Sequence, residues 1–460
     1  MAVPGRAALR RSRAPAFRHG PVRRPALVLL ALSLSLPVAA RSDREAYARP
    51  LPSLTEDAQL ERFFRGRGLF HQAWVIAPSR DEAVDGLGPL YNRITCVACH
   101  PRNGRGQAPS QVDEPMRSML VRLSVDGRDG HGGPRPHPAY GDQFNEQGIP
   151  GVPGGGRATL SWETHTVTLA DGELVELRKP RVHFSELAYG PLNEVKTSMR
   201  VASPVFGLGL LEAIEATTLQ ALATEPKADG IKGRVNQVWS IERQRLEPGR
   251  FGLKANQPDL RQQIASALHG DLGITSPLYP LQNCSPAQRA CQQAISGGEP
   301  ELDGLQLADL HYYFAHLAVP PRRDRDNPEV ISGEQLFTEI GCAACHRPSL
   351  ETGMHPDYPG LSHRRIAPYS DLLLHDMGEG LADGREDYQA SGREWKTPPL
   401  WGLGLSQVIA PGSGYLHDGR ARTLGEAVLW HGGEAQAARQ RFAGLRAGER
   451  RALVAFLRSL

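Results

Sequence analysis

Apolar residues recur at helical spacing in two places along the chain. Between Leu453 and Leu460 they fall at positions i, i+3, i+4 and i+7, and the stretch from Leu310 to Leu317 has the same spacing. In an α-helix these positions lie on one face, so each stretch predicts an amphipathic helix. The helix at 453–460 lies at the end of the sequence, and the helix at 310–317 lies at the end of the segment before it.

Two further features recur in the same order in both segments. A Cys-x-x-Cys-His motif begins at Cys96 and again at Cys342, and each motif precedes one of the amphipathic helices. Between motif and helix, residues 204–210 (PVFGLGL) match residues 399–405 (PLWGLGL). Because three features recur in one order, the pattern indicates two copies of one structural plan.

A charged, proline-flanked linker at 321–328 separates the two copies. We therefore expect one domain at 41–320 and a second at 329–460. A further helix is expected at about 54–66, where it would pack across the first domain. In the second domain a short helix is expected to run directly into the second motif, which is how a cytochrome c domain begins.

The first domain is much longer than the second, and the excess lies between about 105 and 300. Residues 125–156 are rich in Gly, Pro and Asp, a composition typical of loops. Residues 167–177 place two apolar stretches around Asp171-Gly172, which predicts a β-hairpin. The first domain is thus expected to carry a long, loop-rich insertion that contains at least one hairpin.

The first forty residues predict export. Residues 1–24 contain seven Arg and no acidic residue, and a short apolar run then ends in small residues at Ala39-Ala40. This order is typical of a secretory signal peptide at 1–40. The apolar run is shorter than the ~20 residues of a spanning helix, although an uncleaved membrane anchor is the alternative. Removing seven positive charges from a formal net charge of +3 leaves an acidic chain, so the basic excess does not indicate nucleic-acid binding.

The Cys-x-x-Cys-His motif supplies what a c-type haem needs. Its two thiols can form thioethers with the haem vinyl groups, and its imidazole can bind the iron from one face. The motif occurs twice, so we expect two covalently bound haem c groups per chain. The expected attachment and iron-binding residues are Cys96, Cys99 and His100 for the first haem and Cys342, Cys345 and His346 for the second.

Other uses of these cysteines explain less. A zinc site would have to join four thiolates from both domains, and a dithiol redox site would leave the histidine after each motif without a role. The two remaining cysteines, Cys284 and Cys291, bracket a short polar segment. In an oxidising compartment this spacing favours a disulfide that closes a small loop, with two free thiols as the alternative.

The ligand on the far face of each haem decides between two functions. Met or His there gives a six-coordinate electron-transfer haem, whereas an open position admits a substrate. In the second domain the candidates are Met377 and His417, with Met354 and His355 as alternatives. In the first domain they are Met116, Met119, His131, His137 and Met199. Each of these residues could instead have a core or surface role.

Several longer stretches match a known family. They are residues 206–214 and 249–252 in the first half, and residues 369–378, 395–402, 416–421 and 431–435 in the second. On these motifs the chain resembles the bacterial di-haem oxidoreductases, also labelled thiol oxidoreductases, which are similar to di-haem cytochrome c peroxidases. The resemblance covers roughly residues 55–460.

The resemblance implies a mainly α fold with two cytochrome c-like haem domains. It also implies electron transfer between the haems and peroxidase-like chemistry at one of them. One position departs from the pattern, because Leu416 stands where many di-haem peroxidases have a methionine that binds the second iron. The second iron is therefore expected to be left open or to take a neighbouring ligand, Met377 or His417, and Met377 is the favoured candidate.

Two functions remain open from the sequence. The first is an exported di-haem oxidoreductase that takes electrons from a small redox protein or cytochrome and acts on a peroxide or another small substrate. The second is a non-catalytic periplasmic di-haem electron-transfer cytochrome. The size of the chain favours the enzyme, since a carrier needs only ~100 residues per haem. Neither function predicts nucleic-acid binding or a membrane span after signal removal.

Overall fold

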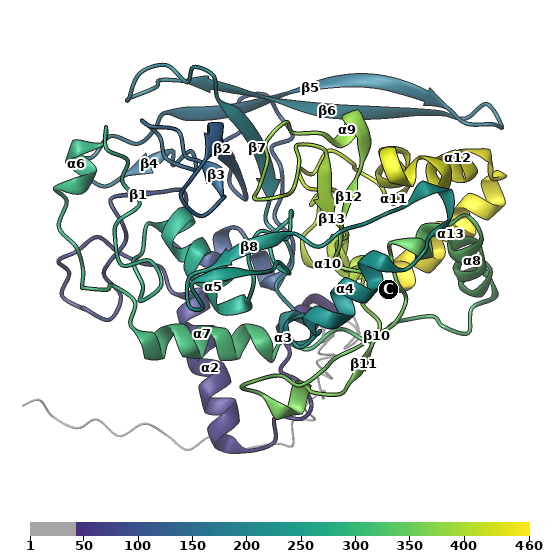
Figure 1. Cartoon of the computed structure of the whole chain (residues 1–460), viewed down its shortest axis with the longest axis horizontal. Helices are drawn as coiled ribbons and strands as arrows, with labels where there is room; N and C mark the ends of the chain where they lie inside the picture. The colour runs from purple at the N-terminus through teal and green to yellow at the C-terminus, as the bar shows by residue number, and fades with distance from the viewer. Residues whose placement is uncertain (1–42) are drawn as a thin grey trace, which may run out of the picture.

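The computed structural model describes residues 43–460, so the predicted signal peptide at 1–40 lies outside the described residues. Within this range the helices are short and are spread along the whole chain (Figure 1). They are α2 (Asp57–His71), α3 (Leu208–Glu212), α4 (Ala216–Thr224), α5 (Leu260–Ala267), α6 (Arg289–Gln292), α7 (Gly304–Ala315), α8 (Pro328–Glu339), α9 (Gly378–Leu381), α10 (Ser406–Ile409), α11 (Leu424–Leu429), α12 (Gln436–Gly444) and α13 (Ala447–Ser459).

Two helix pairs organise the two halves of the chain. The helix α2 packs against α7, and α8 packs against α13. A Cβ atom on Gly66 of α2 would lie 2.1 Å from the carbonyl oxygen of Asp309, and one on Gly333 of α8 would lie 1.9 Å from that of Ala452. Each pair therefore depends on a glycine that lets the two backbones touch. The two closing helices predicted from apolar spacing are α7 and α13, and the helix expected at about 54–66 is α2.

The repeated PVFGLGL and PLWGLGL segments lie against each other. Gly207 and Gly402 have φ angles of 71° and 72°, and each begins a short helix. A Cβ on Gly207 would lie 2.7 Å from the ring of Trp401, and one on Gly402 would lie 2.5 Å from the ring of Phe206. The aromatic residue of each copy thus packs on the glycine of the other. This reciprocal contact confirms the internal repeat and joins the two halves.

The expected fold, mainly α with two cytochrome c-like domains, is wrong. The described residues are 32% helical and 19% strand, and the strands form several small sheets. They are β1 (Leu90–Tyr91), β2 (Met119–Arg128), β3 (Pro134–Arg135), β4 (Gln147–Gly148), β5 (Arg157–Thr168), β6 (Leu174–Ser185), β7 (Lys196–Val201), β8 (Gln237–Ser240), β9 (Arg245–Pro248), β10 (Leu350–Glu351), β11 (Arg365–Ile366), β12 (Leu374–Asp376) and β13 (Glu394–Lys396).

Most of this strand content lies in the segment expected to be a loop-rich insertion. The strands β2 to β9 all fall between 105 and 300. Buried backbone N–H and C=O groups need partners, and chain too rich in Gly and Pro for helices finds them by pairing strand to strand. Residues 125–156, which were expected to be loop, contain no α-helix, but they and their neighbours are ordered by antiparallel pairings such as β2 with β7.

The predicted hairpin is confirmed and is longer than the sequence indicated. The strands β5 and β6 pair antiparallel over their full lengths, from Arg157 with Ser185 to Thr168 with Leu174. The hairpin extends across one side of the molecule, from the sheet of β2 and β7 to α12 (Figure 1). Its tip reaches the second half, where Arg450 of α13 pairs with Asp171 at 2.7 Å and with Glu173. An element of the first half therefore covers part of the second half.

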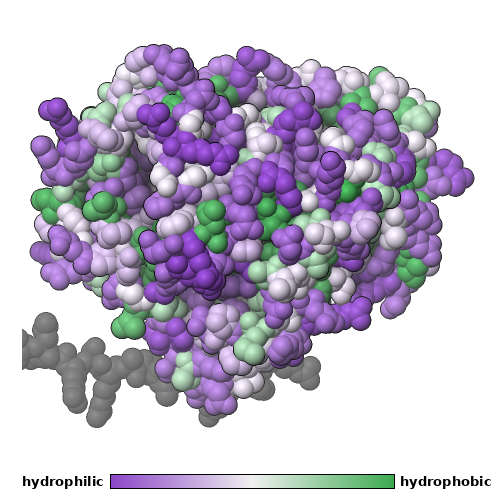
Figure 2. Space-filling view, in the orientation of Figure 1, coloured by the Kyte–Doolittle hydropathy of each residue, from purple (hydrophilic) through white to green (hydrophobic). Residues whose placement is uncertain are grey.

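The predicted Cys284–Cys291 disulfide is confirmed, with the two Cα atoms 5.7 Å apart. It closes the loop that carries α6, within the long segment of the first half. The surface in Figure 2 is largely hydrophilic, with apolar side chains scattered over it. None of the helices in residues 43–460 combines the length and the apolar character that a bilayer crossing requires.

Candidate functional site

One cavity of about 480 Å³ connects the two Cys-x-x-Cys-His motifs. Cys99 and His100 line it from the first motif, and Cys342, Cys345 and His346 line it from the second. Between them the wall is formed largely by residues 395–403, which include Trp395 and Trp401. The structure therefore brings together two motifs that are far apart in the sequence, as the two-haem interpretation requires.

The two motif histidines are held in the same way. The Nδ1 of His100 donates to the carbonyl oxygen of Ser203 at 2.7 Å, and the Nδ1 of His346 donates to that of Tyr369 at 2.9 Å. Both rings line the cavity, and the backbone of Gly104 is a second hydrogen-bond partner of His100. A hydrogen bond from Nδ1 to a carbonyl fixes the tautomer that leaves Nε2 free to bind a metal.

Burial keeps both imidazoles neutral, which is the form that binds iron. It lowers the pKa of His100 to about 4 and that of His346 to about 4, so both rings are neutral at pH 7. An aromatic ring from the opening helix of each half lies near each imidazole: Phe70 of α2 with His100 at 6.4 Å, and Phe337 of α8 with His346 at 6.3 Å between ring centroids. The local arrangement is thus duplicated, with each phenylalanine four residues after the glycine that contacts the closing helix.

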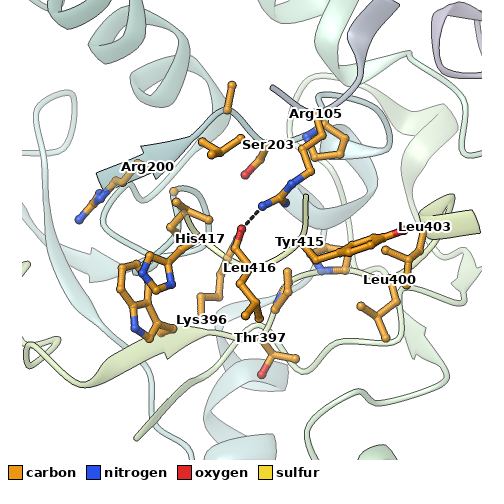
Figure 3. Close-up of a pocket in the computed structure, with 18 of the residues that line it drawn as sticks. Arg105, Arg200, Ser203, Lys396, Thr397, Leu400, Leu403, Tyr415, Leu416 and His417 are labelled. Atoms are coloured by element: carbon orange, nitrogen blue, oxygen red, sulfur yellow. Dashed lines mark hydrogen bonds between the residues drawn. The ribbon is translucent and has the colours of Figure 1, made fainter. Parts of the chain in front are cut away.

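Cations without a carboxylate partner also line the cavity. Arg105 donates to the carbonyl oxygen of Leu416, which comes from the opposite half of the chain (Figure 3), and its Nε is buried without a partner. Lys396 Nζ donates to the carbonyl oxygen of Arg250 at 3.0 Å, and burial lowers its pKa to about 8. Both cations leave charge uncompensated, which fits the propionate carboxylates of haem.

The structure distinguishes among the residues that the sequence offered as ligands on the far face of the haems. In the second half Met377 lines the cavity, whereas Met354 is 72% exposed and His355 is buried with its Nε2 3.1 Å from a Glu212 carboxylate oxygen. His417 also lines the cavity, but its ring stacks on Trp395 and its Nε2 lies 3.3 Å from Asp418. Of these four residues, Met377 is therefore the one that remains available for iron.

In the first half only Met119 of the five candidates lines the cavity. Met116 and Met199 belong to the apolar cluster around β2. His131 stacks on Trp239 with 4.2 Å between ring centroids, and the Nδ1 of His137 accepts a hydrogen bond from the backbone of Ala139. The structure gives these four residues packing or surface roles.

His375 adds a buried charge beside the second motif. Its Nε2 lies 2.9 Å from Asp371 and its Nδ1 lies 2.7 Å from Glu434, while the Cys345 sulfur is 3.6 Å from Nδ1. Burial alone would lower the pKa of His375, but hydrogen bonds to Asp371, Cys345 and Glu434 outweigh it and raise that pKa to about 12. At pH 7 the ring is thus an imidazolium held between two carboxylates, and both of its nitrogens are occupied.

Sequence reasoning gave no role to His431, although it lies in one of the stretches that carry the family resemblance. His431 follows α11 and lines the cavity together with Leu424, Ala427 and Val428 of the same helix. These four residues fall at i, i+3, i+4 and i+7, so helical spacing alone could have placed the histidine on the inward face.

The family comparison agrees with a site for two haems. The chain matches the model of the family described as "Di-haem oxidoreductase, putative peroxidase" over residues 38–460. Among solved structures it is similar to a hydrazine synthase from Kuenenia stuttgartiensis, studied under xenon pressure, at 15% identity and a TM-score of 0.37; the match covers 98% of this chain and 100% of that one. No curated protein sequence matches. The chain belongs to the di-haem oxidoreductase family.

Proposed function

We propose that this protein is an exported di-haem c-type oxidoreductase that passes electrons between two covalently bound haems and reduces a peroxide or a similar small substrate at one of them. The observation that carries the proposal is the single cavity lined by both motifs. Its surroundings are built for two large apolar groups with acidic edges. Covalent attachment is inferred from the paired thiols, and export from the N-terminal pattern.

Haem iron supplies one-electron chemistry and, where an axial position is open, a site for a small oxidant. The chain's own residues supply the rest. The Nε2 atoms of His100 and His346 bind the metal, and the carbonyl oxygens of Ser203 and Tyr369 hold those rings in place. Arg105 offers a buried cation to the propionates. It also donates a hydrogen bond to the carbonyl oxygen of Leu416 in the other half.

The wall between the motifs includes the reciprocal aromatic contacts of Phe206 and Trp401, which lie where the two halves meet. Apolar packing of this kind would hold two redox groups at a fixed separation. The electron donor in this proposal is a small redox protein or cytochrome.

A non-catalytic electron-transfer cytochrome is the second candidate function. It would need two six-coordinate irons, and the cavity offers only a few side chains that could complete the coordination. Among its lining residues the methionines are Met119 and Met377, and the histidines beyond the two motifs are His375, His417 and His431. His375 and His417 are already engaged by carboxylates. Of the three lining residues that remain, Met377 and His431 both come from the second half, and Met119 packs in the apolar cluster around β2. None of the three is thus free to complete the coordination of the first iron, which favours the enzyme.

The test starts from protein produced with a c-type haem maturation system and purified from the periplasm. We expect haem to remain on the denatured chain, the ferric spectrum to contain a high-spin component, and peroxide to oxidise a pre-reduced small cytochrome in the presence of the protein. Release of all haem on denaturation would contradict covalent attachment. Two low-spin haems and no peroxide consumption would establish the carrier instead.

A further inference from the structure

The two halves present equivalent helices to the cavity. From α5, Leu260, Gln263, Ile264 and Ala267 line it, and from α11 and the residues that follow, Leu424, Ala427, Val428 and His431 do so. Both sets have the spacing i, i+3, i+4 and i+7. Ala267 and His431 therefore hold the same position relative to the start of their helices.

The two helices also begin alike. The Asp259 side chain accepts a hydrogen bond from the backbone of Gln262 at 2.7 Å, and the Thr423 side chain accepts one from the backbone of Glu426 at 3.1 Å. Each cap is the residue just before the first lining residue. The equivalence of Ala267 and His431 is thus fixed by the caps as well as by the spacing.

His431 is oriented as a metal ligand would be. Its Nδ1 donates to the carbonyl oxygen of Ala427 at 2.7 Å, and no partner of its Nε2 is recorded within residues 43–460. This is the arrangement of His100 and His346, which use Nδ1 on a backbone carbonyl and leave Nε2 free.

Met377 is the competing ligand, and it lies nearby. A Cβ on Gly432 would lie 3.0 Å from the carbonyl oxygen of Met377, so the loop after β12 and the loop after α11 are in contact. A thioether packs in an apolar core without cost, and Met377 packs against the apolar cluster of the second half. An imidazole nitrogen left without a partner in the interior costs about 1–3 kcal/mol. His431 therefore needs a partner that Met377 does not.

We propose that His431 is the second axial ligand of the haem bound at His346. The haem bound at His100 then keeps the position open for a small substrate, because Ala267 stands where the second half has His431 and Met119 is buried in the apolar cluster around β2 together with Met116. This inference rests on the proposed di-haem function and assigns the substrate to the first iron.

Ferric electron paramagnetic resonance and optical spectra of the holoprotein test the ligand directly. The wild type is expected to show one low-spin haem without the near-infrared band of a thioether–iron bond. His431→Ala should convert that haem to high spin, and added imidazole should restore the low-spin signal. His431→Met should keep the low-spin state and introduce the near-infrared band. His131→Ala, which changes a histidine outside the cavity, is the matched control and should alter neither haem.

The assignment to the second haem is checked with His346→Tyr, which should change the same low-spin signal. An unchanged spin state in His431→Ala, or loss of a near-infrared band in Met377→Leu, would overturn the proposal in favour of Met377 or of an open second iron. These readouts do not depend on turnover. If the spectra respond as expected while peroxide is not consumed, the proposed activity fails and the ligand assignment stands.

Discussion

The regions around the two motifs are nearly identical at the motif histidine and differ at other positions that line the cavity. Each has a glycine-anchored opening helix, a phenylalanine near the motif histidine, and a backbone carbonyl that holds its Nδ1. They diverge at one cavity position, Ala267 in the first region and His431 in the second. They also diverge at the attachment thiols, where Cys345 faces His375 and Cys99 faces the carbonyl oxygen of Arg117 at 3.7 Å. The comparison teaches that a motif and the contacts that support its histidine can be duplicated while a few residues around them differ.

The largest expected effect comes from removing one attachment site at a time. Cys96→Ala with Cys99→Ala should leave one covalent haem, and Cys342→Ala with Cys345→Ala should also leave one. Haem staining after denaturation and the mass of the chain measure this. If attachment is truly duplicated, the two variants lose equal haem. A variant that kept both haems would show that the motif altered in it does not hold a haem covalently.

Removing the His375 imidazolium beside the second motif should lower both the stability of the protein and the reduction potential of one haem. Replacing His375 with Gln leaves Asp371 and Glu434 without their buried cation, and breaking a buried pair in this way costs about 3–5 kcal/mol. The potential of one haem should also fall, since a nearby positive charge is lost. Chemical denaturation and a redox titration measure the two effects. Loss of stability without any shift in potential would place His375 away from the haem.

The same variant predicts a pH dependence. The pKa of His375 is raised to about 12, above the ordinary value near 6.5 of the unfolded chain. Its stabilising contribution is therefore fully present below pH 6.5 and is lost as pH rises toward 12. The difference in unfolding free energy between the wild type and His375→Gln should shrink steadily between pH 7 and pH 10 on the alkaline side. A constant difference over that range would contradict the assigned charge.

The disulfide belongs to the first region alone and should affect only that half. Cys284→Ser with Cys291→Ser opens a short loop and is expected to cost about 2–3 kcal/mol. Thermal unfolding with and without reductant measures the loss. Hydrogen exchange should report it in residues 268–300 and leave α8 and α13 unaffected. An equal change in both halves would mean that the two regions unfold as one unit.

The smallest effect tests how closely the helix pairs match. Gly66→Ala and Gly333→Ala each place a Cβ about 2 Å from a backbone carbonyl oxygen. Overpacking of this kind costs about 1–3 kcal/mol, and the better helix propensity of Ala offsets a part of it. Gly68→Ala is the matched control, because no atom lies within 4 Å of the Cβ it would add. Similar losses in the first two variants and none in the third would support the duplication.

The sequence by itself determined the features that depend on local chemistry or on repetition. The two Cys-x-x-Cys-His motifs, the PVFGLGL repeat, the hairpin around Asp171-Gly172 and the Cys284–Cys291 pair all act over short spans, where residue identity limits the structures available. The sequence also contains a further repeat, because in each opening helix a glycine precedes the phenylalanine by four residues, as in Gly66 and Phe70. The fold class was not, because short strand pairings give no strong periodic signal.

Only the tertiary structure decided which side chains surround the haems. The carbonyl of Ser203 lies 103 residues after His100 and that of Tyr369 lies 23 residues after His346, and neither has a distinctive side-chain pattern. The tertiary contacts also separated Met354, which is exposed, from Met377, which lines the cavity, although both were plausible from residue type. A ligand is defined by where its lone pair points, and that direction is set by contacts between segments far apart in the chain.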